Sequence, residues 1–76
     1  MPAMITVDCW YAEGELYIEF REPEGECDIT VTDTATGFTM TDSFDSAVPY
    51  TLYIGTPASA IITLTTDEGN TYIGEI

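Results

Sequence analysis

Nearly all the side chains in this chain that could do chemistry are carboxylates. Its 76 residues include 14 Asp and Glu and one basic residue, Arg21, with no Lys and no His, so the net charge is −13. Without His or Lys there is no ordinary general base near neutral pH, no Schiff-base lysine and no imidazole ligand for zinc. Any catalysis would have to rest on carboxylates alone.

Paired carboxylates hydrolyse glycosides when a cleft holds them about 5 to 9.5 Å apart. Among 14 acids, some pairs meet this distance by chance. A domain of this size has little volume for a substrate cleft. We therefore expect no enzyme, no catalytic residues and no cofactor.

Calcium binding is a second possibility, because acids and an amide lie in or beside predicted turns: Asp33, Asp42, Asp45, Asp67, Glu68 and Asn70. A specific site needs about six to eight converging oxygens, and the sequence has no Asp-x-Asp-x-Asp-Gly loop. Asp and Asn are also common in turns because they bond the local backbone. We expect no specific metal site, and only weak cation binding through bulk charge.

Trp10 and Tyr17 are the best candidates for contact with a partner. The register predicted below places them side by side on an outward face, where aromatic rings can stack on sugars or anchor a protein. Alternatively, the pair simply stabilises its hairpin by about 0.2 to 1 kcal/mol, and this simpler interpretation is favoured. Tyr53, with outward parity on its own strand, extends the patch if the strand order allows.

The charge also limits the partners. A single cation cannot neutralise a phosphate backbone, so nucleic acid and anionic membranes are excluded as partners. We expect a protein or glycan partner of unknown identity and a monomeric chain.

The elements that position these residues are strands. Apolar and polar residues alternate with period two, and no segment has helical periodicity. The expected strands cover 4–11, 15–21, 27–33, 38–41, 50–54, 60–65 and 71–76. Seven short strands with turns every eight to twelve residues predict one all-β domain over 1–76, a seven-stranded antiparallel sandwich with immunoglobulin-like wiring.

Two hairpins have a predicted register. Glu13-Gly14 is expected to form a two-residue turn that pairs Trp10 with Tyr17 and Cys9 with Ile18, although Glu is a poor first turn residue. Near the C-terminus, Asp67-Glu68-Gly69 suits a three-residue loop with Gly69 at positive φ. That loop pairs Leu64 with Tyr72 and Ile62 with Gly74, where the glycine leaves room for a close neighbour.

The connections are predicted less sharply. Pro23 cannot donate to a ladder, so a charged corner at 22–26 ends the second strand. The segment 42–48 lacks periodicity, and we expect it to cross between the sheets and to bury Phe44 and Val48.

The two cysteines are expected to be free thiols, both buried. Cys9 and Cys27 fall at opposite ends of their strands, on the order of 20 Å apart at about 3.3 Å per residue. A disulfide needs Cα atoms within about 7 Å. Buried free Cys behaves as a small apolar residue.

Part of the pattern resembles a known family. The segments ELYIEF, CDITVTD and AIITLTTDEGNTYIGEI, within residues 15–76, are similar to a Bacteroides-type family of small secreted immunoglobulin-like domains of unknown function. The sharpest signature is the ending at 67–76, and a Cys pair is not associated with this family.

This resemblance implies a seven-stranded sandwich, export behind a leader peptide to the periplasm, cell envelope or outside, and no known catalytic residue. Met1-Pro2-Ala3-Met4 does not have the pattern of a signal peptide, so we expect either that a leader has been removed or that the protein is cytoplasmic. The expected function is a non-catalytic structural or interaction module, and the alternative is a carbohydrate-binding or calcium-dependent accessory domain.

Overall fold

The computed structural model describes residues 7–76, whose regular elements are all strands. They are β1 (Val7–Ala12), β2 (Glu15–Phe20), β3 (Glu26–Asp33), β4 (Thr39–Asp45), β5 (Tyr50–Tyr53), β6 (Ala60–Thr66) and β7 (Thr71–Glu75). None of these residues belongs to a helix that could cross a membrane.

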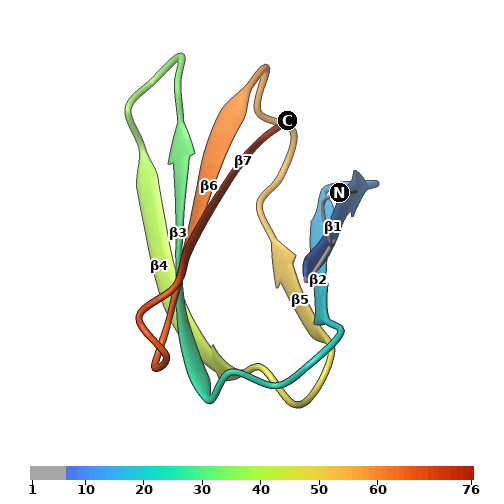
Figure 1. Cartoon of the computed structure of the whole chain (residues 1–76). Coiled ribbons are helices and arrows are strands. Elements are labelled where there is room, and N and C mark those ends of the chain that lie inside the picture. Colours follow the sequence, from blue (N-terminus) through green and yellow to red (C-terminus); the bar gives the residue numbers. More distant parts are fainter. Residues whose placement is uncertain (1–6) are drawn as a thin grey trace, which may run out of the picture.

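The strands form two antiparallel sheets. One has the order β1-β2-β5 and the other β4-β3-β6-β7. Figure 1 shows the sheets facing each other, with the chain passing between them after β2, β4 and β5. The predicted all-β class is confirmed. Of the strand expected at 4–11, residues 4–6 lie outside the described residues.

The inward side chains of the alternating strands form one core between the sheets. β2 contributes Leu16, Ile18 and Phe20, and the other sheet contributes the remaining buried residues: Cys27, Ile29, Val31, Phe44, Ala60, Ile62 and Leu64. Period-two alternation places every second residue on one face of a strand, so each strand turns one row of side chains toward the core. β2 and β6 lie inside their sheets and show the cleanest alternation of burial.

Both predicted hairpin registers are confirmed. Trp10 pairs with Tyr17 and Cys9 with Ile18. Leu64 pairs with Tyr72 and Ile62 with Gly74. Gly69 has φ 82° in the second loop, where the Thr66 amide donates to the Asn70 carbonyl at 2.9 Å.

The prediction that the connection between the sheets begins at residue 42 is wrong. β4 continues to Asp45, which pairs with Glu26, so the crossing begins after Asp45. Phe44 is buried as predicted, but Val48 is 55% exposed. The alternation was hidden because Asp42 occupies an inward position, where its carboxylate accepts a hydrogen bond from the Tyr50 hydroxyl.

Two inward positions at the sheet edges are more open than predicted. Both cysteines are free, but only Cys27 is buried, and the prediction of a buried Cys9 is wrong. Cys9 lies on β1, an edge strand among residues 7–76, where no further described strand shields the thiol, although partial burial still raises its pKa. Gly74, on the edge strand β7, has open space where a Cβ would lie, so no neighbour presses against it.

Candidate interaction face

The first candidate site is the outer face of the three-stranded sheet. Trp10 on β1 and Tyr17 on β2 are cross-strand partners whose rings stack, with centroids 5.6 Å apart and planes at 12°. Trp10 is 50% exposed and Tyr17 is half-buried. The outward placement predicted for both residues is therefore observed.

β2 lies between β1 and β5, which extends the aromatic surface to a third strand. Thr51 pairs with Tyr17, and Tyr53 pairs with Glu15, so Tyr53 is the diagonal neighbour of Tyr17 on the same face. Tyr53 is 68% exposed. We call Trp10, Tyr17, Thr51 and Tyr53 the aromatic face.

Acids surround the aromatic face. Asp8 pairs with Glu19 at one end of the hairpin, and Glu15 lies at the other. Arg21 bonds Asp8, with Nε 3.4 Å from Oδ2, in an exposed ion pair of the kind that contributes at most about 1 kcal/mol. Partial burial and the neighbouring Glu15 carboxylate raise the pKa of Tyr17. The surroundings therefore favour a partner that brings positive charge.

The ring geometry limits what this face can hold. Each ring covers part of one face of the other, so the pair does not form a flat two-ring platform. It offers ring edges and outer faces, which suit insertion beside apolar or cationic side chains of a protein.

Three of the acids considered for calcium accept hydrogen bonds from backbone amides. Asp33 Oδ1 accepts from the amides of Ala35 and Thr36, and Asp45 Oδ1 accepts from the amide of Ala47. Asp67 Oδ2 accepts from the Glu26 amide. In the part of the chain from Val7 onward, no three His, Cys, Asp or Glu side chains are grouped to hold a metal ion.

A buried polar cluster was missed by the sequence prediction. Glu24, in the charged corner, is 7% exposed. Its Oε1 accepts from Thr66 Oγ1 and Asn70 Nδ2, both at 2.9 Å, and its Oε2 accepts from the Tyr72 hydroxyl at 2.6 Å. These residues, the Glu24 cluster, attach the β2–β3 corner to the β6–β7 hairpin.

The backbone of the same corner is also fixed. The Glu24 amide donates to Ser46 Oγ at 2.6 Å, and Ser46 Oγ donates to the Gly25 carbonyl at 2.6 Å. The hydrogen bonds from Tyr72 and Asn70 lower the pKa of Glu24, against the opposing effect of burial. All these donors are neutral, and the cluster with Ser46 holds the β2–β3 corner, the β4–β5 connection and the β6–β7 hairpin together.

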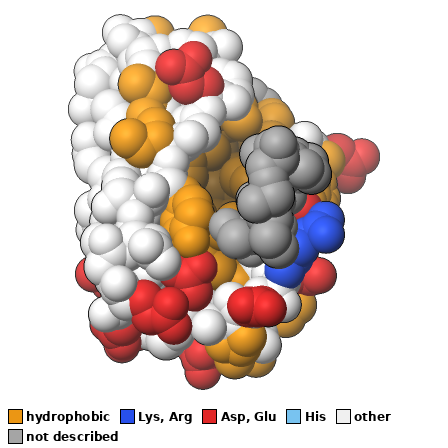
Figure 2. Space-filling view, viewed as in Figure 1, with side chains coloured by type: hydrophobic (Ala, Val, Ile, Leu, Met, Phe, Trp, Pro, Cys, Tyr) orange, Lys and Arg blue, Asp and Glu red, His pale blue; other side chains and the backbone are white. Residues whose placement is uncertain are grey.

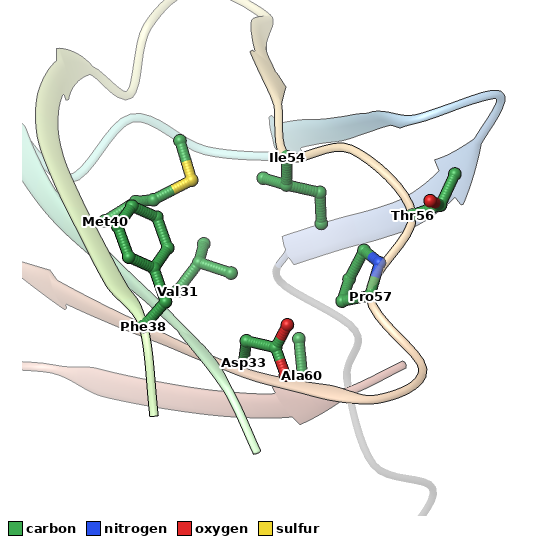
Figure 3. Close-up of a pocket in the computed structure, with 8 residues that line it drawn as sticks. All are labelled: Val31, Asp33, Phe38, Met40, Ile54, Thr56, Pro57 and Ala60. Carbon is green, nitrogen blue, oxygen red and sulfur yellow. The ribbon is translucent and has the colours of Figure 1, made fainter. Parts of the chain in front are cut away.

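One pocket opens between the sheets, beside the β3–β4 turn and the β5–β6 connection (Figure 3). Its volume is about 220 Å³. The lining is mainly apolar: Val31, Phe38, Met40, Ile54, Pro57 and Ala60, with Asp33 and Thr56. Ordinary ligand pockets occupy about 300 to 1,000 Å³ and contain converging polar groups. This pocket is smaller, and the Asp33 carboxylate is engaged in its own turn.

On the face seen in Figure 2, acidic side chains lie at several separate places, the basic side chain lies at one side, and hydrophobic side chains are visible between them. Comparison with known proteins gave no match to a protein family, a curated protein or a solved structure.

Proposed function

We propose that this chain is a non-catalytic, immunoglobulin-like interaction module that binds a protein partner through the aromatic face. The observation that carries the proposal is the exposed Trp10–Tyr17 pair on a regular sheet, extended by Tyr53 and surrounded by acids. Exposed Trp and Tyr are enriched among the residues that contribute most to protein–protein binding.

The strand order supports the immunoglobulin-like assignment. With the strands lettered A, B, C, C′, E, F and G along the chain, the sheets become A-B-E and C′-C-F-G. In immunoglobulin domains A, B and E also share one sheet, and C, F and G the other. Here aliphatic residues of β2 and β6, such as Ile18 and Leu64, take the place of the disulfide that joins B and F in antibody domains.

Charge supports a basic protein as the partner. Asp8, Glu15 and Glu19 lie around the rings, and the net charge is −13. Electrostatic attraction therefore speeds encounter with a cationic surface, and repulsion disfavours nucleic acid or an anionic membrane.

We also propose export to the periplasm, the cell envelope or outside the cell. Fractionation of the producing cells tests this, and recovery in the cytoplasm alone would contradict it.

Photo-crosslinking tests the contact face. A photoreactive phenylalanine analogue at position 10 is expected to give a discrete protein adduct in the producing cells. The matched control carries the analogue at Thr32, on the outer face of the other sheet, and should give no such adduct. Adducts that are absent, or equal at the two positions, would contradict the proposal.

Intrinsic fluorescence gives an independent test, because Trp10 is the one Trp in the sequence. Half-exposed, it should emit at long wavelength. Relative to free tryptophan, its quenching by iodide should be reduced more than its quenching by caesium, since the acids repel anions. A partner identified by crosslinking should shift this emission. A response to soluble glycans, with none to the crosslinked protein, would favour the carbohydrate-binding alternative and overturn the protein-partner proposal.

A further inference from the structure

The outer edge of β7 is unusually exposed for a sheet edge. Among residues 7–76, β7 pairs with β6 and with no other strand. Its central residue, Ile73, is 72% exposed, the highest fraction among the large hydrophobic side chains described. An edge strand with an exposed apolar residue is a template for pairing with another strand.

The ladder with β6 shows which backbone groups of β7 are available. Ala60 and Ile76 exchange both of their hydrogen bonds, at 3.1 and 3.0 Å, and the Thr66 amide bonds the Asn70 carbonyl. Hydrogen-bonded pairs recur every second residue in an antiparallel ladder. The N–H and C=O groups of Thr71, Ile73 and Glu75 therefore point away from β6, toward the free edge.

This edge is complementary to itself. If two copies pair antiparallel about Ile73, then Ile73 meets Ile73, and Thr71 meets Glu75 on both sides. These are the residues whose backbone groups point outward, so all three pairs can form ladder hydrogen bonds. Tyr72 then meets Gly74 of the other copy, where the glycine has open space. No acid faces an acid in this register.

The opposite edge of the same sheet lacks this property. Just before β4, the Phe38 carbonyl accepts a hydrogen bond from the amide of Asp33 on β3. By the same alternation, the backbone N–H and C=O groups of Thr39, Thr41, Ser43 and Asp45 point toward the free edge. Pairing two copies of β4 about its centre sets Asp42 against Asp42. Like charges directly opposite are destabilising.

In the three-stranded sheet, β5 has four residues, and its Tyr50 is packed against β4. The β5 edge is therefore a poorer template for a second copy.

We propose that β7 is a self-association surface, through which two copies pair antiparallel about Ile73 to form one continuous sheet. Two chains of charge −13 repel each other, and salt screens this repulsion. The association is therefore weak in dilute buffer, where the chain is a monomer, and strengthens with added salt and protein concentration.

Sedimentation velocity over a range of protein and NaCl concentrations tests this proposal. Dimer should grow with both variables, and Ile73→Lys should weaken association at least about tenfold, since it opposes two lysines at the centre of the edge. The matched control is Ile61→Lys, which makes the same charge change on the same face of the interior strand β6. A wild type that stays monomeric, or equal loss in both variants, would overturn the proposal.

Disulfide trapping tests the register. In a Cys9→Ser background, Ile73→Cys should give a covalent dimer on mild oxidation, because hydrogen-bonded antiparallel pairs have Cα atoms about 5.5 Å apart, within disulfide reach. Ile61→Cys in the same background should not. A dimer by sedimentation that fails to crosslink at position 73 would place the interface elsewhere and overturn the proposal.

Discussion

Two glutamates, Glu13 and Glu24, occupy positions that glutamate usually avoids. Glu13 has φ 52°, the left-handed region, and is the one non-glycine residue with positive φ among those described. Glu24 places a carboxylate in the interior, where hydrogen bonds from three neutral donors replace the hydrogen bonds that it would make to water. Each position therefore gives a direct test of the structure.

Replacing Glu13 should stabilise the protein. Glu13 and Gly14 both have positive φ, the conformation that Asn-Gly turns favour. Glu13→Asn should raise the free energy of unfolding by about 0.5 to 1 kcal/mol in urea denaturation, because Asn tolerates this backbone region. Glu13→Gln removes the same charge without relieving the backbone, and an equal gain in that control would contradict the conformational explanation.

Glu24→Gln should destabilise the protein by about 1 to 3 kcal/mol at neutral pH, since the amide nitrogen cannot accept the hydrogen bonds that the carboxylate accepts. Chemical denaturation measures this loss. Glu22→Gln, at an exposed carboxylate in the same corner, is the matched control and should change little.

The stabilisation by Glu24 should also depend on pH. Hydrogen bonds lower the pKa of folded Glu24 below its ordinary value of 4.5. Its stabilisation is therefore full above the unfolded pKa and is lost as pH falls through the lower folded pKa. The stability difference between wild type and Glu24→Gln should shrink as pH falls below about 4. A stability difference that stays constant with pH would contradict the stabilisation of the ionised Glu24 carboxylate by its hydrogen bonds.

At the scale of elements, the two sheets are joined at the β4–β5 edge by side chains. Tyr50 on β5 stacks on Phe44 of β4, with centroids 4.1 Å apart and planes at 8°, and its hydroxyl bonds Asp42. This hydrogen bond lowers the pKa of Asp42, while burial and then Asp42 raise the pKa of Tyr50. One tyrosine therefore supplies both an apolar and a polar contact between the sheets.

Two substitutions at Tyr50 separate these contacts. Tyr50→Phe keeps the stack and should return the Asp42 pKa toward its ordinary value, which an NMR titration of the carboxyl measures. Tyr50→Leu also loses the aromatic pair and should cost a further 0.5 to 1.5 kcal/mol or so of unfolding free energy. The Ser43 amide also donates to Asp42 and remains in this variant, so only part of the depression should disappear. If Tyr50→Phe leaves the Asp42 pKa unchanged, the Tyr50 hydrogen bond is not a cause of its depression.

At the scale of the whole molecule, self-repulsion opposes the fold. With 14 acids and one base on 76 residues, most charges have like neighbours, and the ion pair of Asp8 with Arg21 offsets little of this. The fold tolerates this charge because the acids lie mainly on outward positions and in turns. Screening should therefore stabilise the protein.

Thermal unfolding in NaCl measures this effect. Raising the salt from about 10 mM to about 1 M shortens the Debye length from roughly 30 to 3 Å. The Tm should rise by about 4 to 8 °C for each kcal/mol of repulsion removed in a domain of this size. An uncharged solute of equal osmolality is the control, and a rise no larger than that control's would contradict repulsion as the cause. Low protein concentration separates this effect from association at β7.

The sequence by itself determined the local structure. Alternation with period two and the Glu13-Gly14 and Asp67-Glu68-Gly69 turns predicted both hairpin registers, and hence the outward Trp10–Tyr17 pair, because strand parity depends on neighbouring residues. From the charge composition we expect no nucleic acid or anionic membrane as a partner and no catalysis by His or Lys, and the limits on partners remain predictions.

The tertiary structure decided what depends on packing between distant segments. It placed β2 between β1 and β5, which brings Tyr53 to the aromatic face, and it left Cys9, Val48 and Gly74 open. It also buried Glu24 against donors more than 40 positions away. No local pattern contains these outcomes, because burial depends on which strands lie at an edge and which loops meet, and the folded chain alone fixes both.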